Sequence, residues 1–341
     1  MKIAVILFNL GGPDSPDAVE PYLRNLFSDR AIIALPAIFR LPLAWFIAWR
    51  RAPITRAIYE KLGGSSPIVP QTERQARALE AALAERGHEA KAFIAMRAWK
   101  PFAREAARAA KAWGAERVVL LPLYPQYSTA TTASSLAEWA EVAAREGLAT
   151  STGRVCCYPW ATGFVDSIAE MIGAVEKQPG VDYRLLLSAH GLPKRMIGKG
   201  DPYRWQVEKT AAAIVGRLGI VDFSVCYQSR VGPLEWIGPA TDAEIRRAGA
   251  DGKGVILAPI AFVSEHSETL VELDIDYAHV ARDAGVPHYA RVPAVGARPG
   301  FIAALADLVV EATRADVVSC GGGRICPRSC GKCGWGSSIS G

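Results

Sequence analysis

Short apolar runs of strand length alternate with helical patterns along most of the chain. The runs at 2–9 and 255–262 are almost continuously apolar, as in parallel sheets that helices cover on both faces. A capping box of Thr72 and Gln75 predicts where one of the intervening helices begins. The expected strands are 2–9, 117–124, 184–188, 223–227 and 255–262, and the expected helices are 72–86, 101–113, 204–218, 301–313 and two that begin at 241 and 264.

These elements fall into two series along the chain. They predict an α/β fold of two similar, doubly wound parallel-sheet domains with a ligand cleft between them. We expect the first domain at residues 1–150 and the second at 151–314. Residues 315–341 then form a tail that is rich in Gly, Ser and Cys and has no apolar periodicity.

Composition narrows the class of protein. Of the 341 residues, 50% are hydrophobic and 21% are charged, which excludes intrinsic disorder. The net charge of +5 comes without a block of Lys or Arg, so we expect small acidic ligands and no nucleic acid. Prolines and an arginine interrupt the most apolar stretch, 32–49, and no secretory cleavage site follows the N-terminal run, so we expect a cytoplasmic protein.

His190 is a first candidate for chemistry. The strand before it, 184–188, ends at the carboxyl edge of the predicted sheet, where ligands bind in open α/β folds. Gly191 and Pro193 then turn the chain. An imidazole at this edge can accept a proton or bind a metal, and a capped histidine in a turn is the alternative.

Acidic residues follow the last buried strand. On a helix capped by Ser264, Glu265, Glu268, Glu272 and Asp276 fall at positions i, i+3, i+7 and i+11 and share one face. Such a stripe can conduct metal cations toward a site or protons away from it, and a solvated acidic face is the alternative. Glu268 lies in the first turn, nearest to the sheet edge, which makes it the candidate for a site role.

Two aromatic residues also lie at predicted strand ends or loops. Tyr124 precedes a run of Ser and Thr hydroxyls that suits an anionic group, with simple helix capping as the alternative. Trp236 follows a loop, where its ring stacks on a flat ligand or packs in the core. The glycines at 11–12 and 63–64 match no nucleotide-binding fingerprint.

Four cysteines crowd the tail: Cys320, Cys326, Cys330 and Cys333. The glycine-rich segment around them offers no core to bury them, and a reducing cytosol disfavours disulfides. We therefore interpret them as a metal site. Four thiolates suit either tetrahedral zinc or an iron–sulfur cluster, and the spacing alone does not distinguish the two.

Residues 35–50 form an aromatic stretch, which we call the lip. Its large residues are Phe39, Leu41, Leu43, Trp45, Phe46 and Trp49, beside Arg40, Arg50 and Arg51. Apolar aromatics beside arginines are typical of a peripheral membrane contact, here at the inner face of the membrane. A helix packed on the body of the protein and a homodimer contact are the alternatives.

Taken together, seven short motifs resemble those of the ferrochelatase family, whose members insert Fe²⁺ into protoporphyrin IX in the last step of haem synthesis. The resemblance runs from about residue 3 to about residue 313. The motifs are Asn-Leu-Gly-Gly-Pro (9–13), Leu-Gly-Gly-Ser-Ser-Pro (62–67), Tyr-Pro-Gln-Tyr-Ser (124–128), Ser-Ala-His-Gly-Leu-Pro (188–193), Tyr-Gln-Ser-Arg-Val-Gly-Pro (227–233), Trp-Ile-Gly-Pro (236–239) and Phe-Val-Ser-Glu-His-Ser-Glu-Thr-Leu (262–270).

The resemblance implies two α/β domains with a porphyrin cleft, and it implies roles for single residues. The family's catalytic histidine and glutamate correspond to His190 and Glu268, which would also meet the substrate Fe²⁺. Glu272 and Asp276 correspond to the acidic row that carries metal or protons. Whether His190 accepts a proton or binds the metal first stays open.

Other matches imply porphyrin contacts. Leu10, Tyr124 and Trp236 match pocket-wall positions, and Arg97 matches an active-site arginine. Lys61 stands where some relatives have an arginine near a porphyrin propionate. The tyrosine that often follows the active-site arginine is Ala98 here, so that wall contact is absent.

Some ferrochelatases carry a [2Fe–2S] cluster. The internal ligand position of the animal form is Thr129 here, whereas some bacterial relatives have four C-terminal cysteines, as this chain does. This implies a cluster held by the four tail cysteines and leaves Cys156, Cys157 and Cys226 to core packing. Two other functions stay open: a chelatase for coproporphyrin or another tetrapyrrole, and a non-catalytic carrier of tetrapyrrole or iron.

Overall fold

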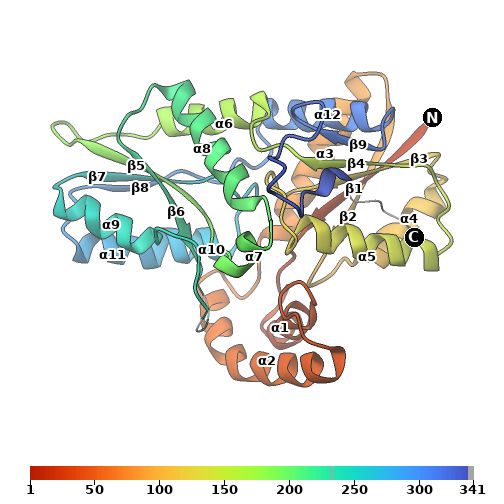
Figure 1. The fold of residues 1–341 in the computed structure, drawn as a ribbon, viewed down its shortest axis with the longest axis horizontal. Coiled ribbons are helices and arrows are strands. Elements are labelled where there is room, and N and C mark those ends of the chain that lie inside the picture. The colour runs from red at the N-terminus through yellow and green to blue at the C-terminus, as the bar shows by residue number, and fades with distance from the viewer. Residues whose placement is uncertain (231, 233, 337–341) are drawn as a thin grey trace. The chain divides into compact units, whose positions relative to one another are not determined.

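The computed structural model describes residues 1–230, 232 and 234–336, which form parts of two compact units (Figure 1). The first unit comprises Met1–Tyr158, Leu305–Ile325 and Cys333–Gly341, and the second comprises Pro159–Ala304 and Cys326–Lys332. Val231 and Pro233 of the 227–233 motif, and residues 337–341 of the expected tail, lie outside the described residues.

The first unit is built on a five-stranded parallel sheet in the order β2-β1-β3-β4-β9. Helices α4 and α5 pack on one face, and α3 contacts β1 and β2 (Figure 1). The strands are β1 (Lys2–Asn9), β2 (Glu89–Met96), β3 (Arg117–Pro122), β4 (Thr152–Cys157) and β9 (Val317–Ser319); the helices are α1 (Val19–Ser28), α2 (Ala37–Glu60), α3 (Ile68–Glu85), α4 (Ala103–Trp113) and α5 (Thr132–Arg145), with short 3₁₀ turns at Pro16–Ala18 and Gly334–Gly336.

The second unit has a four-stranded parallel sheet in the order β6-β5-β7-β8. Helices α9 and α11 pack on one face, while α6 and α8 contact each other and the sheet (Figure 1). The strands are β5 (Tyr183–His190), β6 (Phe223–Gln228), β7 (Gly254–Pro259) and β8 (Tyr289–Arg291); the helices are α6 (Thr162–Gly173), α7 (Lys194–Gly198), α8 (Tyr203–Leu218), α9 (Thr241–Ala250), α10 (Ser267–Leu270), a π-helix (Glu272–Asp276) and α11 (Tyr277–Asp283).

Both sheets have the same winding. In each, the first strand is central, the second lies at the edge, and the third and fourth continue on the other side. This confirms the predicted α/β class with two similar parallel-sheet units. The order places a topological switch point between β1 and β3 in one unit and between β5 and β7 in the other.

The unit boundaries differ from the expected domains 1–150, 151–314 and 315–341. Strand β4 pairs with β3, so the first unit continues to Tyr158. Helix α12 (Pro299–Ala312) begins in the second unit and ends in the first, where β9 adds to the sheet beside β4. A parallel sheet recruits strands from distant segments, and a linear pattern does not show which sheet receives them.

One predicted helix start is wrong. Thr72 lies inside α3, which already begins at Ile68 after Pro67, and the Thr72 side chain is fully buried. Its hydroxyl donates to the Ile68 carbonyl at 2.7 Å and accepts from Asn9 Nδ2 at 3.2 Å. The first turn tolerates Pro70, because its backbone nitrogen has no intrahelical partner to lose there.

Helix α2, which contains most of the predicted lip, buries its small residues and exposes its large ones. Ala48 and Ala52 pack with residues of α1, whereas Phe39 and Trp49 remain 61% and 54% exposed. A helix of a soluble protein normally presents its large apolar side chains to the core. Among the helices of the described residues, none is both long and apolar enough to cross a bilayer.

Candidate active site

The polar residues of the second unit gather at the switch point of its sheet. Strand β5 ends at His190, and the loop after β7 leads into α10, which contains Glu268. The strand order reverses between β5 and β7, and crevices at such points bind ligands because the following loops diverge there.

His190 and Glu268 form a direct pair. His190 Nδ1 lies 2.9 Å from Glu268 Oε2, and both side chains keep about a third of their surface exposed, at 33% and 29%. Burial alone would lower the pKa of His190, but the charge and hydrogen bond of Glu268 raise it above its ordinary value. Burial opposes ionisation of Glu268, yet His190 lowers the pKa of that carboxyl to about 2. The carboxylate of Glu268 therefore stabilises the imidazolium that forms when His190 takes up a proton.

A second histidine supports this pair from the same loop. His266 is the N-cap of α10, and its Nδ1 accepts a hydrogen bond from the backbone N–H of Glu268 at 3.0 Å. Burial lowers the pKa of His266, which keeps its ring neutral and able to accept that bond. The Phe262 ring stands edge-on to His266 at 4.6 Å and to His190 at 6.4 Å. Both residues stand in the motif at 262–270, but nothing in the sequence pattern assigns either of them a role.

The predicted acidic stripe is wrong in part. Helix α10 begins after His266 rather than after Ser264, so Glu265 lies outside it. The Glu265 carboxylate faces Arg291 at 2.6 Å and accepts from the Ala294 N–H. The four residues of α10 are followed by a π-helix. Its characteristic i→i−5 hydrogen bond runs from the Asp276 N–H to the Val271 carbonyl. The wider turn changes which acids share a face, and regular helical spacing does not anticipate it.

Glu272 and Asp276 differ in exposure. Glu272 is half-buried and accepts hydrogen bonds from Ser229 and Tyr277, whereas Asp276 is exposed. Burial and the nearby Glu268 charge raise the pKa of Glu272. The two residues at the ends of the π-helix thus provide a half-buried and an exposed carboxyl.

Trp236 lies beside the turn that follows His190. A β-carbon built on Gly191 would come within 3.2 Å of the Trp236 ring and 2.9 Å of the Gln228 carbonyl. The Trp236 indole N–H is buried and has no hydrogen-bond partner among the described residues. Gly191 is therefore required by close packing, and the tryptophan lies against the turn that follows His190.

The first unit brings three predicted residues to its own sheet edge. Leu10, Arg97 and Tyr124 line one small cavity, next to the carboxyl ends of β1, β2 and β3. Arg97 is held by Asp29 at 3.0 Å and Glu138 at 3.4 Å. Burial raises the pKa of the Tyr124 hydroxyl, which therefore stays neutral.

Lys61, in contrast, does not line this cavity. It is the C-cap of α2 and is exposed. Ala98, which stands where many relatives have a tyrosine, is 1% exposed and packs in the cluster of α1 and α2. The smaller residue therefore leaves no gap in the packing beside Arg97.

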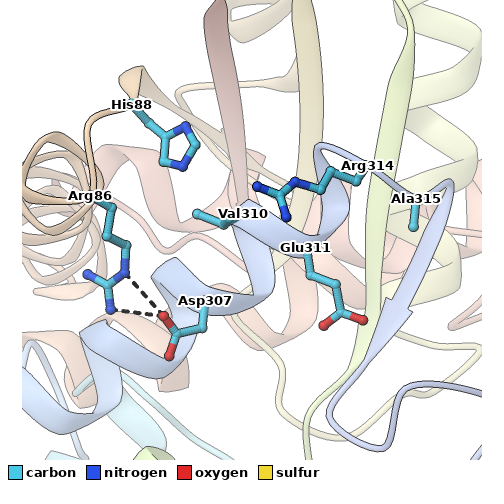
Figure 2. A pocket seen from close by; sticks show the side chains of 7 residues that line it. All are labelled: Arg86, His88, Asp307, Val310, Glu311, Arg314 and Ala315. Atoms are coloured by element: carbon cyan, nitrogen blue, oxygen red, sulfur yellow. Dashed lines mark hydrogen bonds and ion pairs between the residues drawn. The ribbon is translucent and has the colours of Figure 1, made fainter.

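A cavity of about 500 Å³ lies elsewhere in the first unit (Figure 2). It is lined by Arg86 and His88, which come just before β2, and by the C-terminal part of α12. Arg86 donates two hydrogen bonds to Asp307, at 2.9 and 3.1 Å (Figure 2). This is the amino edge of the sheet, opposite to the edge where parallel α/β proteins bind substrates. We therefore do not assign the cavity to catalysis.

The tail cysteines are less exposed than predicted. Cys326 and Cys333 are buried, at 5% and 8%, and Gln206 Nε2 donates to Cys326 Sγ at 3.0 Å. The expectation that nothing could bury them is wrong, because each tail segment packs on a folded unit. Cys156, which we expected to be a plain core residue, also contacts a tail cysteine: hydrogen bonds with Cys157 and Cys333, together with burial, raise its pKa.

The residues do not form a ready ligand set for a cluster. A [2Fe–2S] cluster requires four cysteine thiolates around one position. Across residues 1–230, 232 and 234–336, no group of three or more His, Cys, Asp or Glu side chains is arranged to hold a metal ion. The donor chemistry is suitable, but the arrangement is not preformed.

Comparison with known proteins identifies the family. The model of the ferrochelatase family matches residues 2–313. The chain belongs to the ferrochelatase family. Similar curated ferrochelatases are those of Phenylobacterium zucineum, 52% identical over 98% of each chain, and Caulobacter vibrioides, 53% identical over 90% of this chain and 89% of the relative. The ferrochelatase of Hyphomonas neptunium is 48% identical over 97% of this chain and 94% of its own.

Solved structures show the same fold at low identity. The sirohydrochlorin chelatase SirB from Bacillus subtilis subspecies spizizenii in complex with cobalt aligns with a TM-score of 0.56 at 11% identity, covering 92% of this chain and 96% of that chain. SirB from Bacillus subtilis with Fe³⁺ aligns with a TM-score of 0.51 at 14% identity and the same coverage. These likenesses establish the chelatase-like fold alone; the ferrochelatase assignment rests on the family match and the curated relatives.

Proposed function

We propose that this ferrochelatase-family lyase inserts Fe²⁺ into protoporphyrin IX to form protohaem, with His190 and Glu268 as the catalytic pair. The observation that supports it most directly is the 2.9 Å contact between these two side chains at the switch point of the second sheet. Metal insertion releases two pyrrole protons, and a histidine whose proton affinity is raised by a carboxylate is suited to accept one of them.

The pair also favours one of the two roles for His190. Metal ligation requires a neutral imidazole, whereas Glu268 stabilises the protonated ring. We therefore propose that His190 is neutral before insertion, with its Nδ1–H donated to Glu268, and that it accepts one pyrrole proton at Nε2. The substrate Fe²⁺ is drawn by Glu268 and Glu272, and protons leave through Glu272 toward the exposed Asp276.

Porphyrin contacts are assigned by side-chain chemistry. We propose Leu10, Tyr124 and Trp236 as contacts for the apolar macrocycle, since flat aromatic and apolar side chains stabilise a flat ligand. Arg97 already faces two carboxylates, so its part is to order that pocket wall. Lys61 is the cation that we propose for a propionate.

Iron insertion by the purified protein tests this function. Anaerobic Fe²⁺ with protoporphyrin IX should give loss of porphyrin fluorescence and gain of haem absorbance, and His190→Ala should lower the rate by about 10²–10⁴-fold. Parallel assays with coproporphyrin decide between the two chelatase activities. Binding of porphyrin without turnover, unaffected by His190→Ala, would identify a carrier instead.

We further propose a cytoplasmic enzyme whose lip, the exposed face of α2, touches the inner face of the membrane. Helix α2 carries four arginines and one glutamate, so its surface complements anionic lipid headgroups. Its exposed Trp and Phe side chains match the interfacial region. A second copy of the chain on the same face is the competing occupant.

Finally, we propose that the tail cysteines Cys320, Cys326, Cys330 and Cys333 bind a [2Fe–2S] cluster as the tail folds around it. Metal binding and local folding are commonly coupled, so a ligand set absent without metal forms with it. Because Cys156 contacts Cys333, the internal thiols Cys156 and Cys157 belong in any test of the ligands.

A further inference from the structure

Gln228 links three elements around the catalytic pair. It is the last residue of β6, is 1% exposed, and pairs in register with His190 of β5. Its Oε1 accepts a hydrogen bond from Ser188 Oγ at 2.9 Å. Its Nε2 donates to the backbone carbonyl of Glu268 at 2.9 Å and to Glu272 Oε2 at 3.2 Å.

The orientation of this carboxamide follows from chemistry. A backbone carbonyl and a carboxylate only accept hydrogen bonds, so the NH₂ group of Gln228, which has two donors, must face both of them. The Oε1 atom is then left for the hydroxyl of Ser188, which also lies 3.1 Å from Thr241 Oγ1. The side chain of Gln228 is thereby fixed from three sides.

The next residue holds the same carboxylate. Ser229 has a φ of 62°, the left-handed conformation that glycine adopts most easily. Its N–H donates to Glu272 Oε1 at 2.9 Å, and its hydroxyl donates to Glu272 Oε2. A serine in this conformation stores strain, which its contacts with Glu272 offset. Tyr277 adds a further hydrogen bond to Oε1, at 2.8 Å.

We propose that Gln228 and Ser229 are positioning residues that fix the Glu272 carboxylate relative to Glu268. One carboxamide binds the backbone of Glu268 and the side chain of Glu272, so it sets their separation. Glu272 is then a fixed acceptor at a set place beside the catalytic pair, not a side chain that swings. This inference rests on the proposed function, in which Glu272 receives iron or protons.

A kinetic double-mutant cycle tests the inference. Gln228→Met keeps the length of the side chain but removes both donors, and it should lower kcat on the order of tenfold with little change in the KM for protoporphyrin. In a Glu272→Gln background the same substitution should add almost nothing to the loss of kcat, because the carboxylate that Gln228 positions is then absent. Additive effects, or a Gln228→Met enzyme with wild-type kcat, would overturn the proposal.

Two further measurements separate positioning from plain stability. Ser167→Ala removes a buried hydroxyl that donates to the Gly163 carbonyl within α6, and it should leave kcat unchanged. Ser229→Gly relieves the left-handed conformation and Ser229→Ala retains it, while both remove the hydroxyl. The glycine variant should be the more stable, yet both should lose kcat equally; a kcat that follows stability would contradict the proposal.

The same cycle measured on unfolding in urea needs no activity. Coupling between Gln228→Met and Glu272→Gln in the unfolding free energy reports their contact directly. If Gln228→Met fails to fold, Gln228→Glu preserves the shape and replaces the donors by acceptors. If the two substitutions show no coupling in the unfolding free energy, the proposed positioning is wrong. If they are coupled but the wild-type protein inserts no iron, only the proposed function is wrong.

Discussion

His190 at the end of β5 and Glu268 in α10 are 78 positions apart in the chain, and their side chains meet at 2.9 Å. The contact joins a base to the group that stabilises its protonated form. Because the pair lies at a strand end and in the first turn of a short helix, its geometry depends on two loops. Substitutions in either loop should therefore change the pKa of His190 even where they leave the fold intact.

The pKa of His190 should fall when the Glu268 charge is removed. In Glu268→Gln the effect of burial persists, but the attraction that raises the pKa of His190 is lost. Titration of the His190 ring by NMR should show its midpoint at lower pH than in the wild type. An unchanged midpoint would mean that Glu268 is not the group that sets it.

The same pair should stabilise the protein only within a pH window. The raised pKa of His190 contributes stability that is complete below about pH 6.5 and is lost as the pH rises through the folded value. The lowered pKa of Glu268 contributes stability that is present above its unfolded value and lost as the pH falls toward 2. The unfolding free energy of wild type minus Glu268→Gln should therefore be largest near pH 5–6.

Gly191→Ala should impair catalysis through packing. The new methyl group would meet the Gln228 carbonyl at 2.9 Å and the Trp236 ring at 3.2 Å, so the turn after His190 must shift. We expect a loss of kcat that exceeds the loss of stability. Gly198→Ala is the matched control, since its β-carbon would meet no atom within 4 Å. If the two substitutions lowered kcat equally, close packing at Gly191 would not be the cause.

Membrane contact should depend on the aromatic side chains of α2. Flotation with vesicles that contain anionic lipid should recover the wild type, and Phe46→Ser with Trp49→Ser should reduce recovery severalfold. Val221→Ser removes an apolar side chain that is 91% exposed in the second unit and should change nothing. Absence of flotation, together with a dimer by sedimentation that the α2 substitutions dissociate, would assign the face to a second copy.

The isolated protein should be red-brown, with iron and acid-labile sulfide in equal amounts. Cys→Ser at any of the four tail positions should bleach the visible absorbance, because a missing thiolate leaves an iron without a ligand. Cys226→Ser is the matched control, since Cys226 is fully buried on the second sheet. Bleaching by Cys156→Ser or Cys157→Ser would move one ligand into the body of the protein, and stoichiometric zinc without colour would contradict the cluster.

The pattern of the sequence determined the class of fold and the approximate place of its central strands, whereas β3 and β7 end earlier and β5 ends later than the apolar runs predict. Strand β1 matches the predicted run 2–9 at both ends, because a nearly continuous apolar run that is soon followed by two glycines has few other structures open to it. The position of His190 and Glu268 at the carboxyl edge of the sheet could also be predicted, since residues after buried parallel strands reach that edge wherever the strands pair. The pairing of β9 with β4 could not be predicted from the sequence, because pairing between distant strands leaves no local signal.

Details that depend on several segments at once required the tertiary structure. Regular helical spacing places Glu265 on one face with Glu268 and Glu272. In the structure, however, Glu265 pairs with Arg291 of β8, and the π-helix changes the direction of the acidic side chains that follow. Gln228 and Ser229 carry no catalytic signature in the sequence, and their part follows only from what surrounds Glu272. Hydrophobic periodicity reports which face of an element is buried, whereas the partner of a buried polar group is set by the packing of other elements against it.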